Sequence, residues 1–550
     1  MPWTGLARLL ASDGMAKKIM AKEIELKLLC PREALDRVEQ HPLLRDAPLI
    51  GEPDTLENIY FDTPDLLLSA AKVAVRTRQS RAGAVQTVKC ASESLGGLAV
   101  RPEWEYPFKG EFDFSGVEAD AVRELLQTHK PCLTPMFSTT FLRRTRRVEL
   151  RPGVSVLVMI DAGKVVAGER EEDIAEVELE LVSGEASDLR EFALALATDL
   201  PLLPFDLSKA ERGYRLFAGE ALQPVRAGFI QFGEDWPPLR AFVALAELGL
   251  QAWQADVHGA LVTDNPEFVH QFRVALRRLG ALMRVFEPVL PEAFFDDWTV
   301  AVKEIAATAG EMRDLDVMHM DVLEPMLKGK PGARRREMVG LAIDACQRAR
   351  DRAAAALPGM TRGAPLLAFA QDLAALGQGE SGRRLDRFAS KQLARAHRRA
   401  VKRFDRAVRK PSAETSHALR IALKYLRYSC EFFSPLFETE AMMRYARAVS
   451  RSQDDLGAIN DLHVALGRLD DWAGEDARLR VARDYIADWQ SEKVEAQLAK
   501  ALRRVGQLLR KSQPWSGESA RQGVREARRR LRAGITLKSW STVKVRSASS

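Results

Sequence analysis

The fold is decided by the stretch Ala21-Lys22-Glu23-Ile24-Glu25-Leu26-Lys27-Leu28-Leu29. It carries charged residues at positions 23, 25 and 27 and apolar residues at positions 24, 26 and 28. A period of two is the signature of a β-strand, in which successive side chains face opposite ways. The aliphatic face predicts packing on a core, while the other face presents two carboxylates and an ammonium group. An ordinary solvated sheet face would show the same pattern, so the interpretation depends on whether this face recurs.

The same alternation recurs along the chain as far as residue 181. Residues 176–181, Glu-Val-Glu-Leu-Glu-Leu, nearly repeat the opening stretch, and Arg76 and Arg78 share one face of another run. Many short strands with one apolar and one charged face favour an antiparallel sheet closed into a barrel, because closure also removes the exposed edges. The predicted strands lie within residues 21–29, 58–63, 73–78, 84–89, 101–106, 141–143, 154–161 and 176–181, with a short helix at 31–41.

Charged faces that point into a barrel would line a tunnel containing both carboxylates and Arg or Lys side chains. Carboxylate oxygens bind hard cations such as Mg²⁺ or Mn²⁺, and these cations bridge phosphate oxygens while basic side chains neutralise the remaining phosphate charge. The pattern therefore predicts a site for a condensed phosphate together with a divalent cation. If they pointed outward, the same residues would be ordinary solvated side chains.

An ordered set of motifs within residues 20–218 resembles the CYTH domain of the triphosphate tunnel metalloenzymes. The motifs are Glu23-x-Glu25-x-Lys27, the Arg76-x-Arg78 strand, Lys89, the Glu178-x-Glu180 strand and the closing Ser208-Lys209-Ala210-Glu211-Arg212-Gly213-Tyr214. The resemblance implies an eight-stranded antiparallel β-tunnel that cleaves a triphosphate with Mg²⁺ or Mn²⁺ as cofactor. We expect a lumen carboxylate to orient a water for in-line attack without a covalent intermediate, and which carboxylate takes the proton stays open.

The resemblance also assigns roles to individual lumen residues. Catalytic roles fall to Glu23, Glu25 and Lys27, and metal binding to Glu23, Glu25, Glu178 and Glu180. Phosphate binding is expected from Lys27, Arg76, Arg78, Lys89, Arg143, Lys209 and Arg212. The register at Arg143 stays open because Arg144, Arg146 and Arg147 lie beside it. Further lumen candidates are Glu103, Glu105, Asp161 and Glu176.

The composition limits the class of protein and its compartment. A chain of 550 residues exceeds what one hydrophobic core supports, so two or more domains are expected. No run of about 18 apolar residues occurs, which predicts no membrane span, and the first 20 residues lack the pattern of a signal peptide. The five scattered cysteines show no Cys-x-x-Cys spacing, which favours a reducing cytoplasm and no zinc site. The net charge of +6 is concentrated in the second half and indicates an anionic partner.

The second half of the chain is predicted to be helical and contains one unit twice. Each copy has a histidine followed by basic residues three and seven positions later, which places all three on one helix face. Each copy also has an Asp 44 residues after its histidine. This equal spacing predicts an internal duplication, with two helical bundles whose basic faces converge on a positively charged groove. The copies are His270, Arg273, Arg277 and Asp314, and His417, Arg420, Lys424 and Asp461.

This duplicated region resembles the CHAD domain, a helical module implicated in binding polyphosphate. A solvated basic helix face is the alternative interpretation. The expected architecture is an α+β multidomain chain with a disordered leader at 1–19, the tunnel at 20–218, a linker at 219–235, the helical domain at 236–510 and a basic, mostly disordered tail at 511–550. The resemblance implies polyphosphate contacts from His270, Arg273, Arg277, Arg278, Arg313, His417, Arg420, Lys424 and Arg427.

The predicted function is metal-dependent hydrolysis of inorganic triphosphate, with the helical module recruiting polyphosphate. Hydrolysis of thiamine triphosphate, or cyclisation of ATP as in class IV adenylate cyclases, stays open and would need a pocket for the organic group, to which Tyr60, Phe61 and Trp104 could contribute. A non-catalytic polyphosphate-binding protein is a further alternative, disfavoured by the intact Glu-x-Glu-x-Lys motif. Neither a membrane nor a specific nucleic acid is an expected partner, since the aromatics that stack on single strands are lacking. The oligomeric state stays open.

Overall fold

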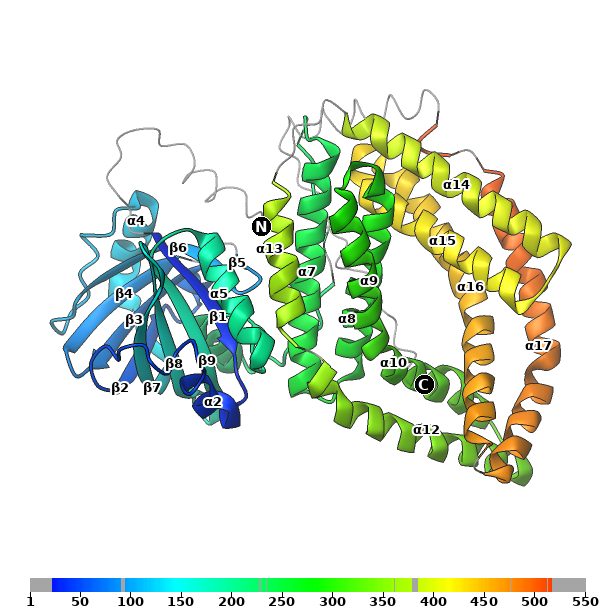
Figure 1. Cartoon of the computed structure of the whole chain (residues 1–550), viewed down its shortest axis with the longest axis horizontal. Coiled ribbons are helices and arrows are strands. Elements are labelled where there is room, and N and C mark those ends of the chain that lie inside the picture. The colour runs from blue at the N-terminus through cyan, green and yellow to red at the C-terminus, as the bar shows by residue number, and fades with distance from the viewer. Residues whose placement is uncertain are drawn as a thin grey trace.

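The structure is a computed structural model that describes residues 22–90, 94–226, 228, 230–233, 235–360, 362–377, 384–474, 476–511 and 513–516. A β-barrel formed by the first part of the chain lies beside a larger helical region formed by the second part (Figure 1). The leader expected at 1–19 and the tail beyond residue 516 lie outside the described residues.

Eight antiparallel strands close the barrel. Around it they follow the order β1, β9, β8, β7, β2, β3, β4 and β6, and β6 pairs back with β1. This confirms the predicted eight-stranded antiparallel tunnel. Two short strands, β5 (Ser94–Leu95) and β10 (Leu203–Pro204), extend the sheet beside β6 and β1. The barrel strands are β1 (Lys22–Leu29), β2 (Asp54–Asp62), β3 (Val73–Ser80), β4 (Gly83–Cys90), β6 (Leu98–Pro107), β7 (Thr134–Arg151), β8 (Val154–Ala167) and β9 (Arg170–Ser183).

The aliphatic face of β1 packs on the outside of the barrel, as its alternation predicts. Leu26 and Leu28 are fully buried in a core that includes Phe192 of helix α5 (Ala186–Asp199). Since α5 covers this outer face, the charged residues between them must point into the barrel (Figure 1). The remaining helices of this part are η1 (Arg32–Ala34), α2 (Leu35–Glu39), α3 (Leu67–Ala70), α4 (Asp120–His129), η2 (Lys130–Cys132) and α6 (Lys209–Ala218).

The helical region consists of two halves whose elements repeat at an interval of 147 residues. Helix α7 begins at residue 238 and α14 at 385, α8 at 266 and α15 at 413, and α9 at 292 and α16 at 439. This regularity is the structural form of the predicted duplication. The helices are α7 (Pro238–Val262), α8 (Pro266–Phe286), η3 (Glu287–Val289), α9 (Glu292–Thr308), α10 (Gly310–Val317), η4 (Met318–Leu323), α11 (Glu324–Leu327), α12 (Ala333–Met360), α13 (Ala364–Ala375), α14 (Leu385–Arg409), α15 (Ala413–Phe433), η5 (Ser434–Leu436), α16 (Thr439–Trp472) and α17 (Ala477–Leu509).

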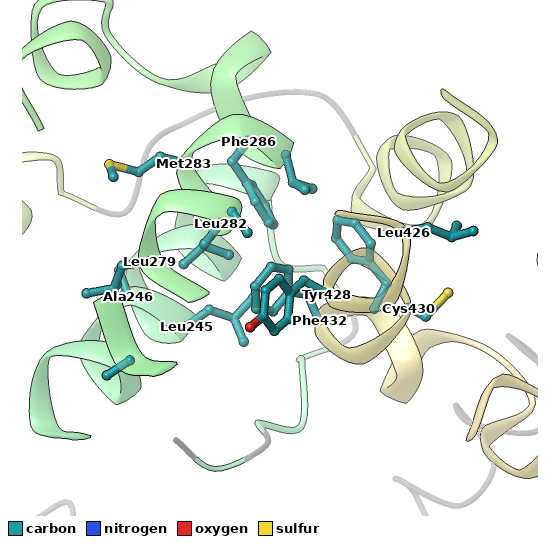
Figure 2. Packing of buried hydrophobic residues seen from close by; sticks show 14 of the residues in the cluster. Leu245, Ala246, Leu279, Leu282, Met283, Phe286, Leu426, Tyr428, Cys430 and Phe432 are labelled. Atoms are coloured by element: carbon teal, nitrogen blue, oxygen red, sulfur yellow. The ribbon is translucent and has the colours of Figure 1, made fainter. Parts of the chain in front are cut away.

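Aromatic packing joins the two halves. Figure 2 shows residues of α8, including Phe286, facing residues of α15, including Tyr428 and Phe432. The ring of Phe286 lies 5.5 Å from that of Phe433 and 5.1 Å from that of Phe388, centroid to centroid. Aromatic pairs at such distances contribute packing energy beyond the area they bury. The basic faces of α8 and α15 are therefore held in a fixed relation by a shared core.

Helix α13 separates the two halves in sequence and lies between the barrel and α7 (Figure 1). Its Leu367 belongs to the core under α5, while Leu203 of β10 belongs to the core of the helical region. A Cβ added at Gly363 would lie only 2.0 Å from the carbonyl oxygen of Leu202, so the two backbones approach closely here. The two parts thus share side chains across their boundary. Within the described residues, no helix combines the length and apolar character needed to cross a lipid bilayer.

Candidate functional site

The barrel encloses a charged cavity of about 630 Å³. On β1, Glu25 and Lys27 are each only 4% exposed and line this cavity together with Glu23. The register of the sheet adds carboxylates from β9, because Glu180 lies opposite Glu25 and Glu178 opposite Lys27. The two Glu-x-Glu motifs, about 150 residues apart in the sequence, therefore form one continuous acidic wall.

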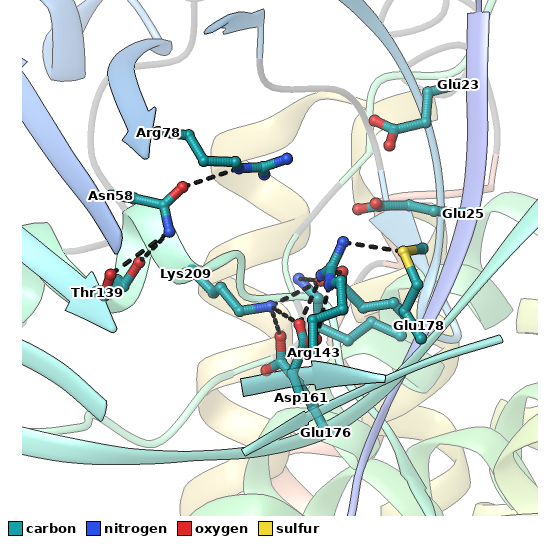
Figure 3. Close-up of polar contacts among 12 residues, drawn as sticks. Glu23, Glu25, Asn58, Arg78, Thr139, Arg143, Asp161, Glu176, Glu178 and Lys209 are labelled. Carbon is teal, nitrogen blue, oxygen red and sulfur yellow. Dashed lines mark hydrogen bonds and ion pairs between the residues drawn. The ribbon is translucent and has the colours of Figure 1, made fainter. Parts of the chain in front are cut away.

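The inner part of the cavity is organised around the ammonium group of Lys209, at the first position of α6. Its Nζ lies 2.8 Å from Asp161 and 3.0 Å from Glu178, and it also contacts Glu176 (Figure 3). Burial alone would lower the pKa of Lys209, but these carboxylates outweigh it and raise that pKa. The side chain of Lys209 is consequently a permanent cation held at a fixed point of the lumen.

Arg143 of β7 faces the lumen and joins the same cluster. Its guanidinium group donates to Asp161 at 2.6 Å and 2.7 Å and to Glu178 at 2.5 Å. Burial would raise the pKa of Glu178, but Lys209 and Arg143 hold it well below its usual range. Arg144 instead contacts Glu39 at 3.2 Å. The structure therefore resolves the register that the sequence left open, with Arg143 inside.

A second group of carboxylates lies at the Glu23 end of the cavity. Lys89 contacts Glu23 at 3.0 Å and Glu103 at 2.6 Å, while Arg101 forms an ion pair with Glu25. The pKa of Glu23 is raised, first by burial and then by the nearby Glu103, although Lys89 opposes the shift. The pKa of Glu180 is likewise raised, by burial and then by Glu23 and Glu103. Glu103 differs, because its burial is outweighed by Lys89 and Arg76, which lower its pKa to about 2, so the repulsion in this group falls on Glu23 and Glu180.

Arg76 and Arg78 extend from β3 into the opposite side of the cavity. Arg78 Nε donates to Asn58 Oδ1 at 3.0 Å, and the Asn58 amide donates to Thr139 Oγ1 at 3.1 Å, which fixes the guanidinium group (Figure 3). The pKa of Arg78 is lowered to about 10 by burial and by the positive charges of Arg76 and Arg143. The Nε of Arg76 is buried without a hydrogen-bond partner. This side of the cavity therefore has positive charge and donor capacity that an anion would satisfy.

Most of the residues predicted from the sequence line this cavity, but Arg212 does not. Arg212 is 3% exposed, and its guanidinium group donates to Glu172 at 2.6 Å and to Glu176 at 3.1 Å. Binding phosphate would require it to leave both carboxylates, and its role in phosphate binding stays a prediction. Asp161 and Glu176 lie beneath Lys209 rather than on the cavity wall. The predicted residues on the wall are Glu23, Glu25, Lys27, Arg76, Arg78, Lys89, Glu103, Glu105, Arg143, Glu178, Glu180 and Lys209.

Arg101 is a lumen residue that sequence reasoning did not assign to phosphate. It lines the cavity, contacts Glu25, and keeps a buried Nε without a hydrogen-bond partner. The signal that would have identified it is its alternation with Glu103 and Glu105 on β6, which puts all three on the inner face.

Two groups of carboxylates could be considered for a divalent cation, and the charges around them differ. Asp161, Glu176 and Glu178 lie close enough for one ligand atom of each to fall within 4.8 Å of the others. The ammonium group of Lys209 already contacts these three carboxylates. Because it compensates their negative charge, the cluster does not need a metal ion for that purpose. The pKa values of Glu23 and Glu180 are raised, by burial and by neighbouring carboxylates, and Glu25 lies opposite Glu180 in the sheet. Their oxygens suit Mg²⁺ or Mn²⁺, and these residues fit a metal better.

The basic faces of the helical region start from equivalent capped helix ends. The Asn265 side chain accepts a hydrogen bond from the Glu267 backbone N–H at 3.0 Å and caps α8. Ser412 Oγ accepts from the Thr415 N–H at 3.1 Å and caps α15. Such caps satisfy backbone donors that the first helical turn leaves free. Because both helices begin at equivalent positions, their histidine and basic residues occupy equivalent positions around the helix axis.

Arg277 of α8 converges with Arg420 and Lys424 of α15. The pKa of Lys424 is lowered to about 8, first by burial and then by Arg277, Arg420 and Arg427. The pKa of Arg420 is also lowered by burial and by Arg277, against the opposing effect of Asp461. The lowered pKa values of Lys424 and Arg420 indicate a site with excess positive charge, to which Arg277 contributes. We call Arg277, Arg420 and Lys424 the basic cluster.

The other predicted polyphosphate residues divide into two groups. Near the basic cluster, Arg273 lies 3.6 Å from Asp314, and His417 Nδ1 lies 2.7 Å from Asn460 Oδ1. His270 lies near Arg313, since burial and then Arg313 lower its pKa. Arg278 and Arg427 instead contact Glu431, at 2.5 Å and 3.4 Å. Glu431 compensates these two, so they contribute less free positive charge than the basic cluster.

The fold and the cavity define a protein with a charged β-tunnel joined to a duplicated helical module. The chain carries a CYTH domain followed by a CHAD domain: the CYTH family model matches residues 21–214 and the CHAD family model matches residues 244–470. An inorganic triphosphatase of Haemophilus influenzae is 28% identical over 291 residues, which cover 53% of this chain and 75% of that protein.

Solved structures also resemble parts of the chain. The CHAD domain from the plant Ricinus communis is 27% identical, with a TM-score of 0.43, covering 52% of this chain and 97% of that one. An adenylyl cyclase-like protein from Hippeastrum, described as having a dominant triphosphatase activity, is 16% identical with a TM-score of 0.27. That match covers 36% of this chain and 97% of the other.

Proposed function

We propose that the tunnel hydrolyses inorganic triphosphate in the presence of a divalent cation. One observation carries the proposal: repelling carboxylates on β1 and β9 and repelling guanidinium groups on β3 share one cavity. A linear phosphate with a bound cation would complement both sides at once. The similarity to the inorganic triphosphatase of Haemophilus influenzae supports the same substrate class.

In this proposal the basic residues bind and orient the substrate. Arg76, Arg78 and Lys209 would hold the phosphate oxygens, with Lys209 fixed by its three carboxylates. Glu23, Glu25 and Glu180 would hold Mg²⁺ or Mn²⁺, which when bound supplies electrostatic stabilisation of the phosphoryl charge. The chain's contribution is then positioning and fixed charge, the terms that dominate phosphoryl transfer.

An organic triphosphate is less well accommodated, because only Tyr60 lines the cavity among the three aromatic residues predicted for its pocket, Tyr60, Phe61 and Trp104. Tyr60 is buried with its ring stacked on Phe137, 4.6 Å between centroids. Phe61 packs edge-on against Phe112, and Trp104 belongs to a core on the outer side of the sheet. A thiamine or adenine ring would therefore meet only one of these three aromatic side chains in the cavity. This favours inorganic triphosphate over thiamine triphosphate hydrolysis or ATP cyclisation.

The activity is tested by measuring phosphate release from triphosphate, thiamine triphosphate and ATP, with and without Mg²⁺ or Mn²⁺. We expect metal-dependent release from triphosphate that is lost in Glu25→Gln. The matched control is Glu171→Gln, which changes an exposed glutamate near the start of β9 that does not line the cavity. Release that continues unchanged in Glu25→Gln would overturn the proposed site, and no release from any substrate would favour a binding protein.

We further propose that the basic cluster of the helical module binds polyphosphate. Its excess positive charge, contributed by both halves, suits an extended polyanion, whose affinity should fall steeply with salt because counterions are released. The test is titration of the full chain with long-chain polyphosphate at several salt concentrations. Arg273→Glu with Arg420→Glu should abolish binding, whereas the exposed pair Arg447→Glu with Arg480→Glu should retain it. Equal affinity in the two double variants would contradict the placement.

A further inference from the structure

The wall of the tunnel cavity includes residues that do not belong to the barrel. Gln251 and Ala255 of α7 and Val225 of the segment before α7 line the same cavity as Glu25 and Lys27. Helix α7 reaches the barrel through Gln251, which contacts Ser94 of β5, although α13 lies between α7 and most of the barrel in the view of Figure 1. The cavity is therefore completed by the helical module.

These residues lie at one end of the tunnel. Gln251 Nε2 donates to the carbonyl oxygen of Ser94 at 3.5 Å, and Ser94 begins the short strand β5, which pairs with the start of β6. Asp206 accepts hydrogen bonds from Ser94 Oγ at 2.5 Å and from the Gly97 N–H at 2.9 Å. The carbonyl of Gly97 in turn accepts from the backbone N–H of Lys27 at 2.9 Å. Gln251 is thus linked through Ser94 to the strand that carries Lys27.

The other end of the tunnel reaches solvent. Glu105 lines the cavity near the end of β6 that lies farther from Ser94. Its side chain is 43% exposed. A linear phosphate entering there would pass the carboxylates and guanidinium groups before it reaches α7. The two ends of the tunnel therefore differ in their lining, with α7 residues at one end and Glu105 at the other.

The α7 end is held firmly against the barrel. The ring of Phe205, next to Asp206, lies 4.7 Å from the ring of His258 on α7. Asp256, fully buried, accepts a hydrogen bond from the Val225 N–H at 2.8 Å and so holds the preceding segment on α7. Side chains fixed in this way act as a boundary rather than as a mobile flap.

We propose that Gln251 and Ala255 form an end wall that fixes how deeply a linear phosphate chain enters the tunnel. The inference rests on the proposed hydrolysis and adds a determinant of specificity to it. A chain whose inner end abuts the wall presents the same P–O–P bond to the attacking water each time. Without the wall, the chain could move inward by one phosphate and present a second bond.

Linear tetraphosphate distinguishes these cases through its first products. In hydrolysis the water oxygen bonds to phosphorus and one bridging P–O bond breaks; the bridging oxygen leaves with its electron pair, and the proton passes to solvent. Cleavage of an end bond gives orthophosphate and triphosphate, while cleavage of the middle bond gives two pyrophosphates. One depth of entry gives one product pair, and two depths give both.

The experiment compares the full-length wild type with a widened variant, Gln251→Ala with Ala255→Gly, and a filled variant, Ala255→Leu. First products from tetraphosphate are separated by ion chromatography at low turnover. We expect a single product pair from the wild type. In the widened variant the second pair should make up at least about one-tenth of the first products. The filled variant should bind non-hydrolysable imidotriphosphate about tenfold more weakly. Controls are Gln223→Ala and Ala333→Gly, both at exposed positions away from the cavity.

The affinity ratio of imidotetraphosphate to imidotriphosphate, measured calorimetrically, gives a readout that needs no turnover. A ratio that rises several-fold only in the widened variant supports the wall, even in a protein that releases no phosphate. A wild type without phosphate release would count against the proposed hydrolysis alone. The same product pair and the same affinity ratio in all variants would overturn the end wall and leave the proposed hydrolysis intact.

Discussion

Glu25 on β1 lies directly opposite Glu180 on β9 in the antiparallel register of the barrel. Two carboxylates thus share one patch of the tunnel wall, and the pKa of Glu180 is raised by burial and by the nearby Glu23. Across the cavity, positive charges of Arg76 and Arg143 help to lower the pKa of Arg78. A cation on the first side and an anion on the second would relieve both repulsions.

Neutralising Glu180 should weaken metal binding without harming the fold. In Glu180→Gln we expect the Mg²⁺ concentration for half-maximal phosphate release to rise by at least about tenfold, because the metal loses one negatively charged ligand. The melting temperature without metal should stay the same or rise, because a repelling charge is removed. A metal titration with calorimetry checks both. An unchanged Mg²⁺ requirement would exclude Glu180 as a ligand.

Removing the ammonium group of Lys209 should destabilise the barrel. Lys209→Met removes a cation that contacts Asp161, Glu176 and Glu178 together and leaves them Arg143 and Arg212; breaking a buried ion pair costs about 3–5 kcal/mol. Chemical denaturation measures the loss. Lys164→Met is the control, because Lys164 contacts Glu171 in an exposed pair that should contribute little.

The pH dependence of this variant gives a second test. In the wild type the low pKa of Glu178 contributes stability that is present above its unfolded value of 4.5 and is lost as pH falls through the lower folded value. Without Lys209, Glu178 keeps only Arg143 and Lys27 as cationic neighbours, so this contribution should shrink and the stability difference between wild type and variant should narrow as pH falls below 4.5. Parallel curves for wild type and variant would show that Lys209 does not compensate these charges.

Polyphosphate binding should depend on pH through Lys424. Its pKa, lowered to about 8 in the free protein, means that the charge is lost as pH rises above that value, so affinity should decrease between pH 7 and 9. In Lys424→Arg the charge persists, and the decrease should disappear. Calorimetric titration of both proteins across this range provides the measurement. The same decrease in both would place the titrating group elsewhere.

Asp256 should make the junction before α7 sensitive to pH. Burial raises its pKa to about 7, and one of its carboxylate oxygens has no hydrogen-bond partner. A raised carboxyl pKa contributes stability that is full below the unfolded value of 3.8 and is lost as pH rises to about 7. Between pH 5 and 8 the melting temperature of the wild type should fall relative to that of Asp256→Asn. The exposed Asp264→Asn should follow the wild type.

Alternation of charge was sufficient to predict the barrel and the inward face of its strands. The period of two in β1 fixes which side chains share a face, and closure of the sheet then leaves the charged face only the interior. The equal spacing of His270 and His417 from their aspartates likewise predicted a duplication, which the structure shows as elements repeating every 147 residues.

The positions of other side chains depend on packing that local sequence patterns do not contain. Arg212 follows Lys209 by three positions on α6, so it points about 60° away around the helix, toward Glu172 instead of the cavity. The sequence contains no signal that indicates which of two neighbouring basic residues on a helix faces the lumen. The contribution of Gln251 to the tunnel depends on how α7 packs against the barrel, a contact between residues far apart in the chain.

The most direct test of the central proposal is a crystal structure of the protein with Mg²⁺ and a non-hydrolysable imidotriphosphate. We predict density for the phosphate chain inside the barrel, with oxygens on Arg76, Arg78 and Lys209 and the metal on Glu25 and Glu180. Imidotriphosphate bound only on the helical module, with the tunnel empty at saturating ligand, would contradict it.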